Sequence, residues 1–325
     1  MARLVSFGEA LIDFVSEPQA NGAPPAFRQH AGGAPANVAV AVSRLGGQAS
    51  FVGGLASDPF GDFLLESLNR AGVGTAGVVR TPCARTALAF VFLDDAGERS
   101  FRFYLDSPAH LAFRPEDFRE TDFGPDIVFH AGSNTLTDPA SAITTLHPLD
   151  QARQKGSMLS FDLNLRLPLW PAGCDPRDPV WQALRRVHLV KLSREELDWL
   201  AQAEGGGRLV IQRLLDGEAR LIVVTDGPRP LSYFTHEYEG EIPAWPVVAR
   251  DSTAAGDAFW GGFLCELVRQ ENPGTGREVW LSERGRLEQT LRFAAASGAL
   301  AVTRQGAFEA MPHRREVEDF LEKRA

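Results

Sequence analysis

The stretch Asp251-Ser252-Thr253-Ala254-Ala255-Gly256-Asp257 is the part of this 325-residue sequence that decides the fold. It lies between residues 242–248, which are typical of extended chain, and residues 258–267, which are mostly apolar and typical of a buried helix. A glycine-containing turn at a helix start presents free backbone N–H groups and the positive end of the helix dipole, which favour an anion such as phosphate. Asp257 is out of place there unless it handles a proton, so it is the candidate general base. The alternative is that it only caps the helix.

The composition is that of an ordinary globular protein, with 44% apolar and 23% charged residues. The formal net charge is -9, and no basic stripe interleaves with aromatic residues, so we expect neither nucleic-acid nor membrane partners. The three cysteines, Cys83, Cys174 and Cys265, lie far apart without metal-type spacing, which fits a reducing compartment. The longest run of small apolar residues, 293–302, is far shorter than a membrane span. We therefore predict a cytoplasmic protein.

Short apolar runs alternate along the chain with longer segments that have a helical period. The short runs predict buried strands over residues 4–7, 49–53, 127–130, 158–162, 189–192 and 221–225. The longer segments predict helices over residues 36–45, 60–71, 141–155, 179–186, 194–202 and 287–302. Such alternation implies βαβ units, and hence an α/β protein whose mostly parallel sheet is covered by helices on both faces.

Two pairs of segments with the side-chain alternation of hairpin strands interrupt this pattern. The pairs are residues 11–15 with 26–30 and residues 86–93 with 99–105, and residues 94–98 supply the turn of the second pair. We interpret the two pairs, inserted at about 11–30 and 86–105, as one small sheet that forms a lid. Because the sequence has no long linker and no internal repeat, we predict a single domain over residues 1–325.

A second glycine-rich stretch, around Gly32 and Gly33, precedes the first predicted helix. Two adjacent glycines let the backbone approach a ligand closely. Asn37, in the first turns of the helix, offers a hydrogen-bond donor and an acceptor, which suits a polyhydroxylated substrate. Asp13, on the first lid strand, can accept two hydroxyl hydrogen bonds. The alternatives are a tight turn that starts a helix, and a carboxylate that faces solvent on an edge strand.

Polar residues also follow the predicted strands. Ligands bind at the carboxyl ends of parallel strands, where Asp162, Asn164 and Arg166 lie at alternating positions. Arg166 can neutralise a phosphate or orient a substrate oxygen, unless it forms a structural salt bridge. Ser193 and Glu196 have the spacing of a helix capping box, which explains them fully. A second interpretation is that Glu196 holds the water shell of Mg²⁺. A nucleotide's phosphates could lie at the turn of Thr225 and Gly227.

Taken together, these residues resemble the ribokinase-like (PfkB) carbohydrate kinases, and most closely the bacterial fructokinases. Residues 32–37 with 44–47 and 51–61 are similar to the N-terminal signature of that family, and residues 251–257 are similar to its C-terminal signature. Residues 8–13, 85–91 and 162–170 resemble fructokinases in particular. The resemblance runs from about residue 3 to about residue 321, and two signatures in the expected order are far stronger than either alone.

The resemblance implies a ribokinase-like three-layer α/β/α sandwich with a small β-sheet lid, and an ATP-dependent kinase that converts fructose to fructose 6-phosphate with Mg²⁺. Asp257 would be the base, and the backbone N–H groups of Ala255, Gly256 and Asp257 would form an anion hole. The substrate would be held by Asp13, Gly32, Gly33, Asn37, Tyr104 and Arg166. The nucleotide would be bound by Asn164, Ser193, Thr225, Gly227, Ala254 and Gly256. Glu196 would lie near Mg²⁺ through water, and Asp251 and Thr253 would bind a monovalent cation, with K⁺ the candidate.

Some positions depart from the family pattern. Ala254 stands where glycine is usual, and its methyl group is costly if the turn needs a positive φ. Ser193 replaces the commoner Asn, Ala295 replaces an Asn of the adenine region, and Leu105 stands where an Arg would suit a sugar acid. The absence of that Arg disfavours 2-keto-3-deoxygluconate, which together with other furanoses is the alternative substrate. The departures at Ala254, Ser193 and Ala295 motivate a second alternative, a catalytically silent sugar-binding or regulatory protein. We also predict a homodimer formed through the lids, because an exposed apolar sheet face favours a partner.

Overall fold

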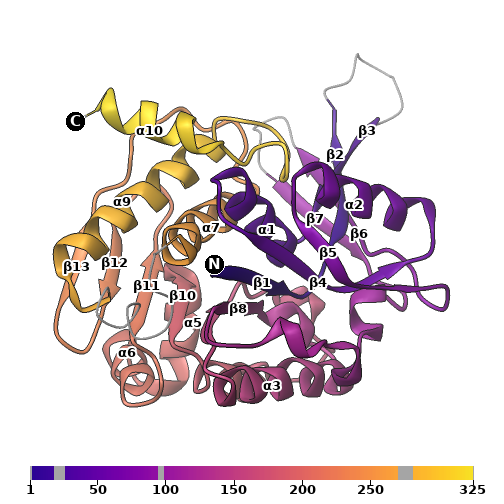
Figure 1. Cartoon of the computed structure of the whole chain (residues 1–325), viewed down its shortest axis with the longest axis horizontal. Helices are drawn as coiled ribbons and strands as arrows, with labels where there is room; N and C mark the ends of the chain where they lie inside the picture. The colour runs from indigo at the N-terminus through magenta and orange to yellow at the C-terminus, as the bar shows by residue number, and fades with distance from the viewer. Residues whose placement is uncertain (1, 18–25, 94–98, 270–280, 325) are drawn as a thin grey trace.

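A nine-stranded sheet in the order β13-β12-β11-β10-β9-β8-β1-β4-β5 runs through the described part of the chain (Figure 1). The computed structural model describes residues 2–17, 26–93, 99–269 and 281–324. The strands are β1 (Arg3–Phe7), β4 (Ala49–Ala56), β5 (Gly74–Thr81), β8 (Ile127–Gly132), β9 (Met158–Asp162), β10 (Leu189–Ser193), β11 (Leu221–Thr225), β12 (Leu231–Phe234) and β13 (Glu239–Ile242). Neighbouring strands are parallel from β11 to β5 in this order. Strand β12 pairs antiparallel with both β11 and β13.

Helices cover both faces of this sheet, which makes three layers (Figure 1). One face carries α1 (Ala34–Arg44), α2 (Pro59–Arg70), α7 (Ala255–Val268), α9 (Arg284–Ala301) and α10 (Arg314–Glu322). The other face carries α3 (Pro139–Gln154), α4 (Arg177–Leu184), α5 (Arg194–Glu204) and α6 (Gly207–Leu215). Each face buries its own apolar cluster, around Trp260 and Phe263 on the first face and around Phe129 and Phe161 on the second. Burial on both faces explains why the central strands are continuous apolar runs.

A second sheet of four strands, in the order β3-β2-β6-β7, projects from the edge of the large one (Figure 1). Its strands are β2 (Leu11–Ser16), β3 (Phe27–Gly32), β6 (Leu88–Leu93) and β7 (Arg99–Tyr104). The two outer pairs are antiparallel, and β2 pairs with β6 in parallel. The prediction that both hairpin pairs join into one small sheet is therefore confirmed. The turn predicted over residues 94–98 lies outside the described residues.

The six predicted strands of the large sheet and the six predicted helices are present, with ends shifted by up to three residues. The sequence interpretation did not include β5, β12, β13, α6 or α10. The extended segment predicted over residues 242–248 is a strand only at Ile242, and residues 243–249 have no regular structure. Pro243 and Pro246 lack the N–H group that a sheet ladder needs. Helix α7 therefore follows a long loop rather than a strand.

Within the described ranges, no helix combines the length and the apolar character needed to cross a membrane.

Candidate active site

The first turn of α7 carries the candidate anion hole. Ala255 and Gly256 are its first residues, and Asp257 is 8% exposed in the same turn. Ala254 precedes the helix in the left-handed conformation, with φ +57° and ψ +13°. That conformation costs a residue with a Cβ about 1–2 kcal/mol. Ala254 is therefore a strained position at which the chain turns into α7, and the N–H of the next residue, Ala255, donates a 3.3 Å bond to the carbonyl of Ser252.

Asn37 lies next to Asp257, because helices α1 and α7 pack closely together. Gly261 makes the close approach possible, since a Cβ there would lie 2.4 Å from the Cβ of Ala41 on α1. The Asn37 amide Nδ2 donates a 2.7 Å hydrogen bond to Oδ2 of Asp257. No donor among the described residues reaches Asn37 Oδ1, although that atom is buried. An unpaired buried oxygen is costly, so this one is suited to accept a hydrogen bond from a ligand.

Burial raises the pKa of Asp257 to about 6, and the neighbouring Asp162 adds to the rise. The hydrogen bond from Asn37 and the positive charges of Lys191 and Arg166 act in the opposite direction. A general base works best when its pKa lies near the working pH. Asp257 is therefore a better base than an ordinary aspartate, and it remains mostly ionised at neutral pH.

Asp13 projects from β2 toward the same region and is 9% exposed. A Cβ on Gly32 would lie 2.3 Å from Asp13 Oδ2, so only glycine leaves room for this carboxylate. Gly33, with φ +105°, begins α1. Burial raises the pKa of Asp13 to about 7, while the charge of His30 on the paired strand lowers it. The structure thus brings Asp13, Gly32 and Gly33 close to Asn37 and Asp257.

Tyr104 does not join this group. In the small sheet Asp13 is aligned with Ala89, and Ala89 is aligned with Phe103, so those three residues share a face. Tyr104 lies on the opposite face, is 63% exposed and stacks edge-on against Phe90. The prediction of Tyr104 as a substrate residue is therefore not supported by its position. Side chains alternate along a strand, and the residue that shares the face of Asp13 is Phe103.

The carboxyl ends of β9 and β10 supply the next group of predicted residues. Ser193 caps α5, and its hydroxyl accepts a 3.2 Å hydrogen bond from the Glu196 N–H. The Glu196 carboxylate accepts 2.7 Å bonds from the N–H groups of Ser193 and Leu165. The capping box is therefore present, and Glu196 also fixes the segment that follows β9. Asn164 in that segment has a positive φ of 38°.

Arg166 follows two residues later, and its side chain is exposed. Its charge nevertheless reaches Asp257 and lowers the pKa of that carboxyl. Thr225 ends β11, where its hydroxyl donates a 3.4 Å bond to the carbonyl of Leu192. Gly227 follows with φ +56°, a conformation that favours glycine. Four of the predicted nucleotide residues, Asn164, Ser193, Thr225 and Gly227, thus lie at or just after the carboxyl ends of adjacent parallel strands, whereas Ala254 and Gly256 lie at the start of α7.

Asp251 organises the loop before α7 and is 1% exposed. Its Oδ1 accepts a 2.7 Å bond from the N–H of Thr253, and its Oδ2 accepts a 3.0 Å bond from the N–H of Gly306. The backbone N–H of Asp251 in turn donates a 3.1 Å bond to the carbonyl of Val302. The predicted monovalent-cation loop is thus tied to the chain segment that follows α9.

Two charged residues at the site, Glu9 and Lys191, were not predicted from the sequence, and Asp162 was expected near a ligand but without its partner. Glu9 lies after β1, and burial raises its pKa to about 7. Asp162, at the end of β9, and Lys191, in the middle of β10, form a buried ion pair. A lysine inside an otherwise apolar strand is a signal that could have been used, because lysine is almost never fully buried without a partner.

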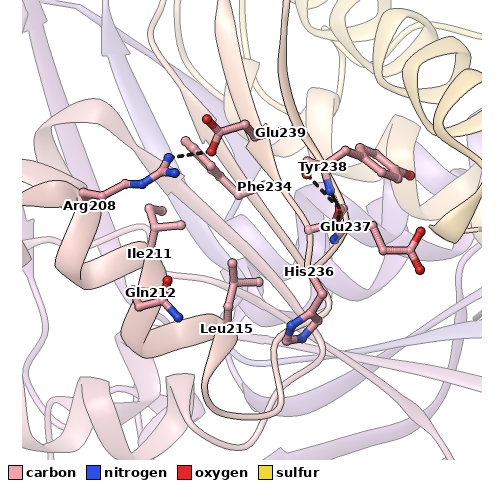
Figure 2. A pocket seen from close by; sticks show the side chains of 10 residues that line it. Arg208, Ile211, Gln212, Leu215, Phe234, His236, Glu237, Tyr238 and Glu239 are labelled. Carbon is pink, nitrogen blue, oxygen red and sulfur yellow. Dashed lines mark hydrogen bonds and ion pairs between the residues drawn. The ribbon is translucent and has the colours of Figure 1, made fainter.

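The hollow in Figure 2 shares no residue with this group. It measures about 280 Å³ and lies between α6 and the β12–β13 hairpin, where Arg208 pairs with Glu239. Phe234 and Thr235, which border it, stand at the end of β12 remote from Thr225, since β11 and β12 are antiparallel. The hollow is therefore separate from the cluster around Asp257.

Residues 1–314 match the pfkB family of carbohydrate kinases. The chain belongs to that family, and the ribokinase-like α/β/α fold expected from the resemblance is confirmed.

Three relatives illustrate the similarity. The chain is 37% identical to fructokinase-1 of Zea mays over 324 residues, which cover 98% of each protein. It is 48% identical to the fructokinase of Xylella fastidiosa solved with bound ATP, with a TM-score of 0.94 and coverage of 99% of this chain and 98% of that one. It is 31% identical to the fructokinase of Vibrio cholerae O395 solved with fructose, ADP and calcium ion, with a TM-score of 0.87 and coverage of 99% of both chains.

Proposed function

We propose that this protein is an ATP-dependent fructokinase that transfers the γ-phosphoryl group to the primary hydroxyl of D-fructose and forms fructose 6-phosphate. The observation that carries the proposal is the 2.7 Å hydrogen bond between Asn37 and Asp257 at the start of α7, with Asp13 nearby. Membership of a carbohydrate kinase family and the similarity to fructokinases from maize, Xylella and Vibrio support the choice of reaction and sugar.

In this mechanism the sugar lies between the small sheet and α7. Asp13 accepts hydrogen bonds from sugar hydroxyls, and the unpaired Oδ1 of Asn37 accepts another. Gly32 and Gly33 allow the sugar to approach the backbone. Asp257 takes the proton of the attacking hydroxyl, a role that typically contributes about 10²–10⁴-fold to the rate.

The anion hole acts on the group that is transferred. The backbone N–H groups of Ala255, Gly256 and Asp257 stabilise the charge on the phosphoryl oxygens, and the dipole of the 14-residue helix α7 adds to that effect. Phosphoryl transfer depends mainly on such positioning and charge stabilisation. Arg166 would contact either a phosphate or a substrate oxygen. The ATP phosphates and the rest of the nucleotide would lie along Asn164, Ser193, Thr225, Gly227, Ala254 and Gly256.

The cations proposed are Mg²⁺ with the nucleotide and K⁺ at the loop before α7. Among the described residues no three His, Cys, Asp or Glu side chains gather as a ligand set. That arrangement suits Mg²⁺, which keeps several waters and binds mainly through phosphates, with Glu196 holding part of its water shell. Asp251 and Thr253 supply oxygen donors for K⁺, and a double mutant of the Vibrio fructokinase was solved with fructose, ADP and potassium ion. These cations would neutralise phosphate charge.

We further propose that residues 1–325 form one catalytic domain and that the small sheet is a lid over the sugar. A closing lid excludes water and limits wasteful hydrolysis of ATP. The aromatic face of the small sheet, formed by Phe14, Phe27, Phe90, Phe92 and Tyr104, would pack against a second copy in a homodimer. The three dispersed free cysteines support a cytoplasmic location.

The test is release of ADP by the purified protein with MgATP and fructose, compared with the Asp257→Asn variant. We expect turnover by the native protein and a loss of about 10²–10⁴-fold in the variant. Equal turnover by the two proteins would refute the role of Asp257. Turnover by neither, with fructose still bound in calorimetry, would favour a silent sugar-binding protein.

A panel of sugars ranked by kcat/KM tests the substrate. Leu105 packs with Leu11, Ala87 and Ala89 in an apolar cluster on the small sheet, so this position offers no cation to a sugar acid. We therefore expect fructose to exceed 2-keto-3-deoxygluconate and other furanoses. A sugar acid that exceeded fructose would replace the proposed substrate without changing the reaction.

A further inference from the structure

A buried ion pair joins Lys191 and Asp162 directly beneath the first turn of α7. The two residues are aligned across the parallel strands β9 and β10, so their side chains leave the sheet on the same face. Lys191 Nζ lies 2.8 and 2.7 Å from the two carboxylate oxygens of Asp162. The exposed fractions are 5% for Lys191 and 2% for Asp162. Burying such a pair gives little net stability, because desolvation offsets the attraction, so its presence at this place calls for a function.

The ammonium group lies against Gly256. A Cβ built on Gly256 would be 3.1 Å from Nζ and 3.5 Å from Cε of Lys191, and the distance to Nζ is shorter than an ordinary van der Waals contact. The absence of a side chain at Gly256 therefore gives the ammonium group its place against the first turn of α7. Among the described residues both hydrogen bonds of Lys191 go to Asp162, and an ammonium has three donors.

Carboxylates from three elements surround this cation. Burial acts to lower the pKa of Lys191, but the negative charges of Asp162, Glu196 and Asp257 outweigh it and raise that pKa. Lys191 therefore stays positively charged at neutral pH. The charged groups that act on Asp257 come from every side of the site: Glu9, Asp13, Asp162, Arg166 and Lys191. Lys191 is the deeply buried cation of this group, since Arg166 is exposed.

We propose that Lys191 is a positioning residue for phosphoryl transfer: held by Asp162 against Gly256, its ammonium group places a fixed positive charge beside the anion hole and beside Asp257. The inference rests on the proposed function, because it assumes that the first turn of α7 receives the phosphoryl group. A fixed charge in a site sheltered from water acts far more strongly than in water, and it needs no reorganisation during the reaction. Asp162 has the supporting task of orienting the ammonium group.

The experiment compares the native protein with Lys191→Met and Lys191→Ala under saturating MgATP. We expect kcat to fall by about 10²-fold in both variants, the typical loss when one stabilising donor is removed. We expect KM for fructose to change by less than about threefold, because a charge that acts only in the transition state lowers kcat without weakening binding. Ethylammonium added to Lys191→Ala should restore part of kcat. A kcat within about threefold of the native value, or a loss confined to KM, would overturn the proposal.

Controls separate this role from a structural one. Arg119→Met also removes the cation from a buried carboxylate, since Arg119 pairs with the fully buried Asp122 just before β8, at the opposite end of the sheet. We expect that variant to unfold at a lower temperature but to keep its kcat. If Lys191→Met does not fold, the double variant Asp162→Asn/Lys191→Met removes both charges and should show the same loss of kcat.

Asp257→Asn distinguishes the two proposals. If that variant is inactive while Lys191→Met keeps full kcat, only the inference about Lys191 is wrong. If Asp257→Asn itself remains fully active, the proposed function of the turn is wrong and the inference about Lys191 is overturned with it.

Discussion

Asn37 Nδ2 donates a 2.7 Å hydrogen bond to Oδ2 of Asp257 across 220 residues of sequence. The bond joins the first turns of α1 and α7. It orients Asn37, which would hold the sugar, toward Asp257, which would take the proton of the sugar hydroxyl. It also favours the ionised form of Asp257, because a hydrogen bond donated to a carboxylate stabilises the negative charge. One side chain thus contributes to substrate binding and to the strength of the base.

Asn37→Ala removes both contributions. We expect KM for fructose to rise and kcat to fall, each by about tenfold, because a hydrogen bond to a charged group contributes about 1.5–3 kcal/mol. The pH at which kcat/KM falls to half should also move upward, since the pKa of Asp257 rises without its donor. A pH profile of kcat/KM provides the measurement.

The matched control for Asn37→Ala is Ser141→Ala on α3, which also truncates a fully buried polar side chain. The control should leave the pH profile where it is in the native protein. A profile of Asn37→Ala that coincided with the native one would contradict the coupling of Asn37 to Asp257.

The free energy of unfolding of the ligand-free protein should decrease as pH rises from about 4 to about 7. Burial raises the pKa of Glu9 and Asp13 to about 7 and that of Asp257 to about 6, so the folded state holds protons that the unfolded state has released. Stability is then fully present below the unfolded pKa values and is lost as pH rises through the folded values. Urea unfolding at several pH values in this window measures the decrease.

Asp257→Asn should make the fall in stability with pH smaller and should stabilise the ligand-free protein at neutral pH by about 1–3 kcal/mol, while it lowers turnover by about 10²–10⁴-fold. The amide can still accept the hydrogen bond from Asn37. Asp138→Asn, at the start of α3, should instead leave stability nearly unchanged, because the asparagine amide oxygen can still accept from Ala140 and Ser141 and asparagine caps helices about as well as aspartate. A variant Asp257→Asn that was less stable than the native protein at neutral pH would contradict the sign of the pKa shift.

Ala254→Gly should stabilise the protein by about 0.5–1 kcal/mol. Relief of the left-handed conformation at φ +57° gains about 1–2 kcal/mol, and the greater freedom of glycine in the unfolded chain takes part of that back. Ala255→Gly, one residue later at the first position of the helix, should destabilise by up to about 1 kcal/mol. Thermal and urea unfolding of the two variants give the comparison, and the same sign for both would show that the conformation of Ala254 is not strained.

The sequence was sufficient to predict the architecture, but not to predict which face of the small sheet each side chain occupies. Strand β9 was predicted with its observed bounds, because burial on both faces leaves an uninterrupted apolar run between polar boundaries. The edge strand β5 was missed, since its two glycines and half-exposed residues give no such run. The sequence interpretation assigned Tyr104 to the substrate, but the residue that shares the face of Asp13 is Phe103. A difference of one residue in register moves each side chain of a strand to the other face, and the sequence alone does not give the register.

The candidate site shows the same limit. Asp257, Asn37 and Asp13 could be found because each interrupts an apolar or glycine-rich context. Lys191 could not be assigned a role, since its partner Asp162 lies 29 residues away and only the alignment of β9 with β10 brings the two together. Contacts between strands depend on register, which the local sequence does not contain.

Tyr104→Glu should convert the proposed dimer to a monomer while the fold is kept. On the aromatic face of the small sheet Phe90 contacts Phe14, Phe27 and Tyr104. Tyr104 is 63% exposed and Phe92 is 40% exposed, so this face presents two large apolar side chains to solvent. A buried carboxylate without a partner is costly, so a glutamate within an interface would separate the two copies, whereas on a free surface it would be tolerated.

Ile143→Glu on α3 is the control for the dimer prediction, because Ile143 is 62% exposed but lies outside the small sheet. Light scattering coupled to size-exclusion chromatography should give twice the chain mass for the native protein and for Ile143→Glu, and the single chain mass for Tyr104→Glu. A single chain mass for the native protein would exclude the dimer, and an unchanged mass for Tyr104→Glu would move the interface away from this face.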